Sequence, residues 1–230
     1  MSGERMQAGA TPPRARAAWA RWALALWAAG VAWALAGPAA AAWGVASAQD
    51  PEVRAGARVF LDQCRFCHSL RYVRYAELEA LGVDEDTLRQ AAGEAGLQAP
   101  VARLSDEASL QGMFGLVPPD LSLMAKAREG GAAYIEELLL GYEQGPGGQV
   151  RNRVFPGIAM PDVLGVAGAD EAARRQAETQ ARQVAAFLAW AADPRAEERV
   201  RLGYYVEAYL LVLTVLLYLV KRRIWSRLES

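Results

Sequence analysis

The segment Cys64-Arg65-Phe66-Cys67-His68 holds both cysteines and the single histidine of this 230-residue chain. Two thiols three positions apart, with an imidazole directly after them, have the spacing of a c-type haem attachment site. The thiols can bond to the two vinyl groups of one haem, and the imidazole can then lie under its iron. The sequence therefore predicts one covalent haem c on Cys64 and Cys67, with His68 as a ligand of the iron.

Two other uses of this segment stay open on spacing alone. A dithiol redox pair would need no histidine directly after it. A zinc site would need a fourth protein ligand, and because the chain has no further cysteine or histidine, only carboxylates could supply it. Both alternatives leave part of the pattern unexplained, so the segment favours haem.

The N-terminal region has the pattern of an export signal. Arginines precede an apolar stretch over residues 22–36, which is short for a membrane span and typical of a signal peptide. Small residues at 46 and 48 then offer a cleavage site. We predict a cleaved signal peptide over residues 1–48. An uncleaved anchor is the alternative, and either one exports the domain that follows.

The C-terminal region has the pattern of a membrane anchor. Residues 202–220 contain one charge, Glu207, and nineteen residues at 1.5 Å each cover about 28 Å, close to the hydrocarbon thickness of a bilayer. Tyr218 and Trp225 lie near its end, as interfacial aromatic residues do. Three cations at 221–223 follow directly and predict a cytoplasmic C-terminus. A buried helix of a soluble protein is the alternative.

These segments divide the chain into four parts: a signal peptide (1–48), a periplasmic cytochrome c domain (49–201), a transmembrane helix (202–220) and a cytoplasmic tail (221–230). The expected location is a bacterial inner membrane. Residues 49–220 hold 17 basic and 24 acidic side chains, a net charge of −7. An acidic exported domain suits a basic soluble partner and argues against nucleic acid. The acidic side chains after the haem motif are either a steering patch for that partner or an ordinary solvated helix face: Glu77, Glu79, Asp84, Glu85 and Asp86.

The iron needs a sixth ligand or an open position, and methionine is the natural candidate because no second histidine exists. Met160 lies between Pro156 and Pro161, whose rings restrict the loop and suit a thioether that stays on the iron. Met113 and Met124 fall in a Leu-rich stretch, where we expect them to fill the core. The other two methionines lie in the leader. The pattern therefore favours Met160.

Helical periodicity fills much of the exported domain. It predicts helices over residues 51–64, 130–140 and 170–192, and no run of alternating residues indicates a strand. The expected fold class is all-α: a cytochrome c-like haem domain with a single C-terminal transmembrane helix.

The chain resembles the cytochrome c1 family, the haem subunit of the cytochrome bc1 complex. The segments that carry the resemblance occur in family order: 64–75 (CRFCHSLRYVRY), 118–142, 152–164 (NRVFPGIAMPDVL), 184–194 and 201–225. The resemblance implies that Met160 is the axial methionine, that Arg128 meets a haem propionate, and that Tyr134 lies in the pocket. It also implies that Pro118 and Pro119 line the haem. Arg128 as an ordinary surface cation is the alternative.

One segment departs from the family pattern. Residues 104–117 lack the aromatic- and proline-rich stretch with paired asparagines that usually precedes the two prolines. This departure affects contacts at the haem edge and leaves the two expected iron ligands in place.

The resemblance also implies a function. Such a subunit receives single electrons from a Rieske iron–sulfur protein, beside cytochrome b, and passes them to a soluble or tethered cytochrome c. The chain is then an electron carrier within quinol–cytochrome c oxidoreductase, in a respiratory or photosynthetic membrane, and none of its residues needs to act as acid or base. Two other classes stay open: a membrane-anchored shuttle or terminal-oxidase haem subunit, and a haem-based ligand sensor.

Overall fold

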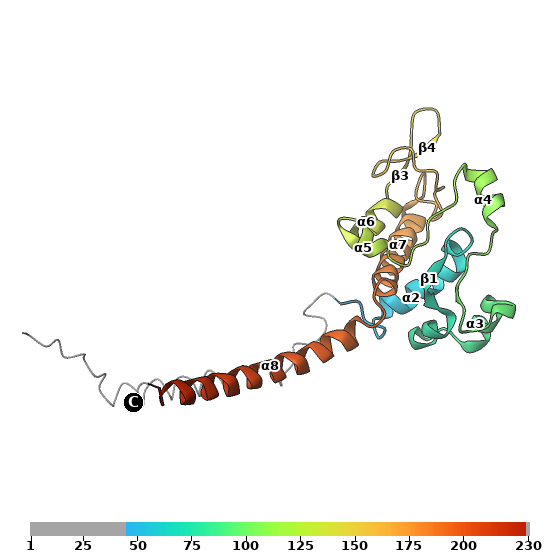
Figure 1. The fold of residues 1–230 in the computed structure, drawn as a ribbon. Coiled ribbons are helices and arrows are strands. Elements are labelled where there is room, and N and C mark those ends of the chain that lie inside the picture. The colour runs from blue at the N-terminus through green and yellow to red at the C-terminus, as the bar shows by residue number, and fades with distance from the viewer. Residues whose placement is uncertain (1–44, 229–230) are drawn as a thin grey trace, which may run out of the picture. The chain divides into compact units, whose positions relative to one another are not determined.

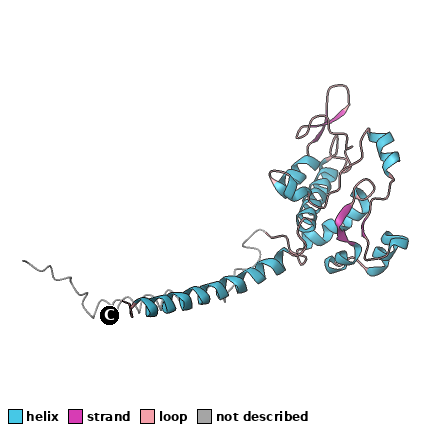
Figure 2. Ribbon diagram, in the orientation of Figure 1, coloured by secondary structure: helices cyan, strands magenta, loops and turns pink. Residues whose placement is uncertain are grey.

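Helices make up most of this computed structural model, which describes residues 45–228 (Figures 1 and 2). The described residues belong to two units, one that runs to Glu197 and one that starts at Glu198. The predicted signal peptide lies outside the described residues except for its last four. The predicted boundary at residue 201 falls inside a helix, close to the boundary between the units.

The chain enters the candidate site through helix α2, Pro51–Val59, and a π-helical turn, Phe60–Cys64. The side chain of Asp50 caps α2 by accepting a hydrogen bond from the Glu52 amide at 2.9 Å. The Arg65 amide donates to the Phe60 carbonyl at 2.9 Å, so the last turn is one residue wider than an α-helical turn. The prediction of a helix over 51–64 is confirmed, with this change of winding where the haem motif begins.

Helix α7, Glu171–Ala191, packs against α2 along the core (Figure 1). Gly56 makes the close approach possible, because a Cβ there would collide with the backbone carbonyl of Gln183. The rings of Phe60 and Phe187 then lie 5.5 Å apart between centroids. The predicted helix over 170–192 is confirmed, and its N-terminus is capped by Asp170.

Shorter helices complete this unit: η3 (Tyr75–Leu81), α3 (Glu85–Ala92), η4 (Gly93–Ala95), α4 (Glu107–Phe114), α5 (Met124–Ala127) and α6 (Gly131–Leu139). Helix α6 confirms the prediction over 130–140. The acidic side chains around α3 mostly have local structural roles, since Asp84 caps α3 through the Thr87 amide and Glu85 pairs with Arg89 at 2.7 Å. This supports the solvated helix face, and steering of a partner stays a prediction.

Two antiparallel ladders were not expected from the sequence (Figure 2). Strand β1, Leu70–Arg74, pairs with β2, Pro100–Val101, and β3, Tyr142–Gln144, pairs with β4, Val150–Asn152. Strands of two to five residues are too short to show an alternating pattern, and their pairing depends on distant segments. The expectation of no strands was wrong, while the helical fold class is confirmed.

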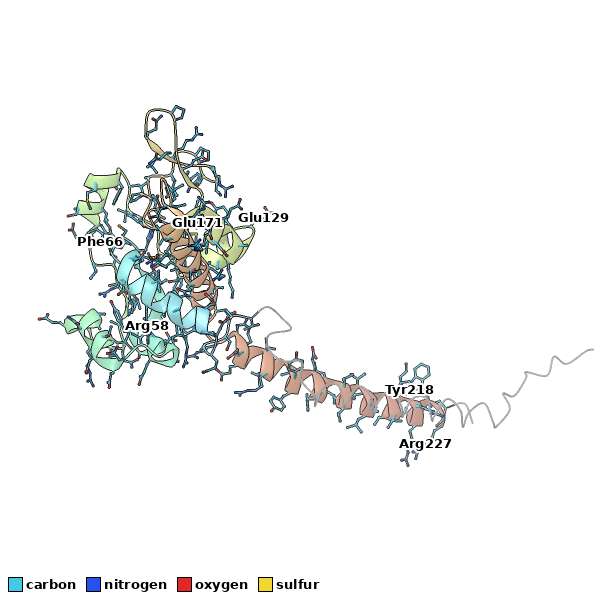
Figure 3. All side chains as sticks on the ribbon, turned by 180° about the vertical axis from the view of Figure 1, so that it is seen from behind. Arg58, Phe66, Glu129, Glu171, Tyr218 and Arg227 are labelled. Atoms are coloured by element: carbon cyan, nitrogen blue, oxygen red, sulfur yellow. The ribbon has the colours of Figure 1, made fainter. Side chains whose placement is uncertain are left out.

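Helix α8, Ala196–Trp225, contains the whole predicted span. Within the described residues it is the one helix long and apolar enough to cross a membrane. Its apolar side chains are exposed along its length, and Figure 3 shows Tyr218 and Arg227 near its C-terminal end. Exposed apolar surface of this extent is unfavourable in water. The helix therefore fits a single-pass membrane anchor.

Candidate functional site

All eight residues predicted for the site line one cavity of about 260 Å³. The structure brings them together from four segments of the chain: Cys64, Cys67 and His68, then Pro118 and Pro119, then Arg128 and Tyr134, and finally Met160. Apart from these residues and Gln63, every side chain that lines the cavity is apolar. The cavity can therefore take a large apolar group beside an imidazole, two thiols and a thioether.

His68 is held in one orientation and one tautomer. Its Nδ1 lies 2.8 Å from the carbonyl oxygen of Pro119, so Nδ1–H donates and the lone pair of Nε2 is free for a metal. Burial lowers the pKa of His68, which keeps the ring neutral near pH 7. A neutral imidazole with a fixed tautomer is the form that ligates iron.

The surroundings of the two thiols favour neither a redox pair nor a zinc site. Burial, followed by the nearby Cys67, raises the pKa of Cys64 to about 12, and burial also raises the pKa of Cys67. A reactive dithiol needs the opposite shift, because the thiolate is the nucleophile. Among residues 45–228, no cluster of three or more cysteine, histidine or acidic side chains could hold a metal ion, so no carboxylate joins His68 to complete a zinc site.

Asp120, which sequence reasoning missed, fixes the carbonyl that holds His68. Its Oδ2 accepts hydrogen bonds from the Ser69 hydroxyl and the Arg71 amide, each at 2.8 Å. Its Oδ1 accepts one from the Ser122 amide at 3.0 Å. These bonds join the segment after His68 to the segment after Pro119. A single acidic residue after two prolines gives no sign of this role in the sequence.

This network predicts an acid-sensitive contribution to stability. Partial burial alone would raise the pKa of Asp120, but hydrogen bonds from Ser122 and Ser69 outweigh it and hold the pKa below the ordinary 3.8. The stabilisation is therefore fully present above the ordinary value and is lost as the pH falls through the lowered pKa. At pH 7, Asp120→Asn should lower the free energy of unfolding by about 1–3 kcal/mol, measured by denaturant titration.

The pH dependence separates this effect from a general loss of packing. The difference between Asp120→Asn and the unchanged protein should shrink at pH values below 3.8. Asp86→Asn, whose side chain is 94% exposed, is the matched control and should change little. An equal loss for Asp120→Asn at neutral and acid pH would contradict the charged network.

Met160 lies half-buried in the loop between β4 and α7, and its side chain lines the cavity. The Tyr142 hydroxyl donates to its backbone carbonyl at 2.7 Å. Burial, followed by the Asp162 carboxylate, raises the pKa of Tyr142 to about 12, so the hydroxyl remains a donor at neutral pH. Met124 also lines the cavity and packs against the core. The expectation that Met113 fills the core was wrong: it is 56% exposed, because α4 buries only Leu110.

Arg128 and Tyr134 flank the turn between α5 and α6. Gly130 and Gly131 have φ values of +86° and +55°, which allow the chain to turn sharply between the two residues. Arg128 is exposed and forms no ion pair within the described part of the chain. Its guanidinium can therefore pair with an anionic group at the cavity.

Arg65 is a buried cation inside the haem motif that sequence reasoning also missed. Its Nε donates to the carbonyl of Ala102 at 3.0 Å, and a second nitrogen donates to the carbonyl of Ala91. The guanidinium also lies 5.4 Å from the centroid of the Tyr75 ring. Carbonyl dipoles and an aromatic face compensate its charge. The residue therefore ties the motif to α3 and to the residue after β2.

Comparison with known proteins gives consistent matches. The profile of the Cytochrome C1 family matches residues 44–111 and 97–228. Cytochrome c1 of Rhodospirillum rubrum is 32% identical over 220 residues, which cover 76% of this chain and 81% of that protein. Cytochrome c1 of Allochromatium vinosum is 32% identical over 203 residues, which cover 74% of this chain and 82% of that protein. The mitochondrial cytochrome c1 haem protein of Neurospora crassa is 35% identical over 208 residues, which cover 77% of this chain and 63% of that protein.

Proposed function

This chain belongs to the cytochrome c1 family, and we propose that it is the electron-transfer haem subunit of a cytochrome bc1 complex. In this role it takes single electrons from the Rieske iron–sulfur protein and gives them to a cytochrome c. The observation that carries the proposal is the gathering of His68, Met160 and the two thiols at one apolar cavity. A shuttle or oxidase subunit is less well supported, because the family match extends through the domain and the tail.

We assign one haem c to the cavity, held by thioethers to Cys64 and Cys67 and ligated by His68 and Met160. When bound, the haem supplies reversible one-electron storage at its iron. The Pro119 carbonyl orients His68, and the apolar walls limit the access of water. With an imidazole and a thioether as its two protein ligands, the iron would have a higher potential than with two imidazoles. Arg128 supplies a cation for a propionate.

We further propose that the domain lies on the periplasmic side and that the tail is cytoplasmic. The cations at 221–223 directly follow the apolar part of α8, as the positive-inside rule requires. Glu207 lies within the span, where an isolated carboxylate is costly against lipid. We assign its side chain to a contact with a partner helix or with lipid head groups.

The redox activity belongs to the complex with cytochrome b and the Rieske protein, and this chain carries its electrons.

The anchor leads to a prediction for a chain that ends at Arg201. Removal of most of α8 should move the haem-stained domain from the membrane pellet to the supernatant, because the exposed apolar surface of the helix is lost. The visible spectrum of the domain should be unchanged, since every cavity residue lies before α8. The full chain, washed with high salt, is the control. A truncated chain that still pellets after the same wash contradicts the anchor.

Purification of the full chain through a C-terminal affinity tag tests the function. Mild detergent extraction should yield a haem-stained band together with a b-type cytochrome and an iron–sulfur protein. A quinol should reduce the c-type haem in this preparation and should fail to do so once the partners are removed by harsher detergent. Recovery with oxidase subunits, or quinol reduction by the isolated chain, would support the alternative instead.

A further inference from the structure

We propose that Tyr142 is a positioning residue for the sixth iron ligand. Its hydroxyl holds the backbone of Met160, and through it the thioether, at the cavity wall. This inference rests on the proposed function, because it takes Met160 as a ligand of the haem iron.

The part of the loop next to Met160 has few hydrogen bonds. No helix or strand occurs between β4, which ends at Asn152, and α7, which begins at Glu171. The residue after Met160 is Pro161, which has no amide hydrogen to donate. Within the described part of the chain, the backbone of residues 159–161 makes a single hydrogen bond. It is the one that the Met160 carbonyl accepts from the Tyr142 hydroxyl at 2.7 Å. The prolines restrict the loop internally. The Arg153 amide ties the start of the loop to the Gly141 carbonyl at 2.9 Å, and Tyr142 connects the part around Met160 to the rest of the fold.

Tyr142 can do this because it is itself firmly held. It is 5% exposed and forms a small core with Val166 and with Ala177 of α7. It pairs with Asn152 across the β3–β4 ladder. The side-chain amide of Asn152 donates in turn to the Leu138 carbonyl of α6 at 2.7 Å. The hydroxyl is therefore fixed relative to two helices that line the cavity.

The residue before Tyr142 has little room for a side chain. A Cβ on Gly141 would lie 2.9 Å from Oδ1 of Asn152 and from Cγ2 of Val154. On the far side of Met160, Asp162 accepts a hydrogen bond from the Ala167 amide at 2.7 Å and closes the loop on itself. The loop is thus a closed turn, and the Tyr142 hydroxyl bonds it to the hairpin that β3 and β4 form.

Loss of this bond should make release of the thioether easier without unfolding the domain. One neutral hydrogen bond changes an equilibrium by about twofold to tenfold. Tyr142→Phe removes only the hydroxyl and keeps the ring in its packing against Val166. The expected result is therefore a partial loss of methionine ligation, and the far-ultraviolet circular dichroism should stay unchanged.

The test uses the full haem-loaded chain in detergent. For Tyr142→Phe we expect the apparent affinity of the reduced protein for carbon monoxide to rise about twofold to tenfold. The sulfur-to-iron charge-transfer band of the oxidised protein should weaken, and the midpoint potential should fall. Tyr72→Phe is the exposed tyrosine control at 62% exposure. Arg151→Ala is the hairpin control, because it removes the 2.9 Å ion pair with Glu143 and leaves the hydroxyl in place.

A parallel Met160→Leu variant separates this inference from the proposed function. If that variant leaves the band and carbon monoxide binding unchanged, Met160 is not the ligand and the proposed site fails. If it changes both while Tyr142→Phe matches the unchanged protein, only the role of Tyr142 is overturned. An equal effect from Arg151→Ala would also overturn it, since loosening the hairpin would then be sufficient.

Discussion

Replacing Cys64 and Cys67 together with alanine should abolish haem staining of this chain on a denaturing gel. Staining survives denaturation only when the haem is bonded to the protein, and the sequence holds no other cysteine to replace the two thiols. Each single replacement should leave reduced staining, because one thioether can still form. For the double variant, we expect haem staining to fall from the level of the unchanged protein to background. An immunoblot of the same gel shows whether the chain is present.

This experiment also decides between haem and the two alternatives for the motif. A dithiol pair would give an unstained native chain whose thiol labelling changes with a reductant. A zinc site would give an unstained native chain that contains metal. Thr87→Ala, at an exposed position of α3 that does not line the cavity, is the control for handling. Unchanged staining of the double variant would mean that the haem is held by another chain or another bond.

The sequence predicted those parts of the site that depend on neighbouring residues. The motif at 64–68 is contiguous, so its chemistry can be inferred without a fold. Met160 was favoured because its flanking prolines are local too. Arg128 and Tyr134 came from the family resemblance, since nothing in their immediate surroundings indicates a cavity. The structure places them on the cavity, and their contacts with haem stay a proposal.

The residues that sequence reasoning missed act through distant contacts. Tyr142 meets Met160 across 18 positions, and Asp120 meets Ser69 across 51. No periodic pattern encodes such pairs, because they depend on how the loops fold back on the helices. For Met113, in contrast, the sequence predicted a buried position that the structure does not show. Its Leu-rich surroundings predicted a place in the core, but α4 buries a single residue, Leu110.

Met160→Leu should open the iron to external ligands and lower the midpoint potential. Leucine has about the volume of methionine, so the apolar cavity should keep its shape at a cost below about 1.5 kcal/mol. The thioether, which favours the ferrous state, is lost. The reduced variant should therefore bind carbon monoxide nearly completely, whereas the unchanged protein should bind little. The potential should fall by on the order of 100 mV, part of the roughly 0.8 V that axial ligands set.

Met124→Leu is the matched control, because Met124 is the other methionine that lines the cavity. Both methionines pack against the core. Because we assign the iron to Met160, Met124→Leu should change neither carbon monoxide binding nor the potential. If Met124→Leu opened the iron and Met160→Leu did not, the ligand assignment would be reversed. If the unchanged reduced protein already bound carbon monoxide fully, the iron would have an open position. That result would support the ligand-sensor alternative and count against the electron-transfer role.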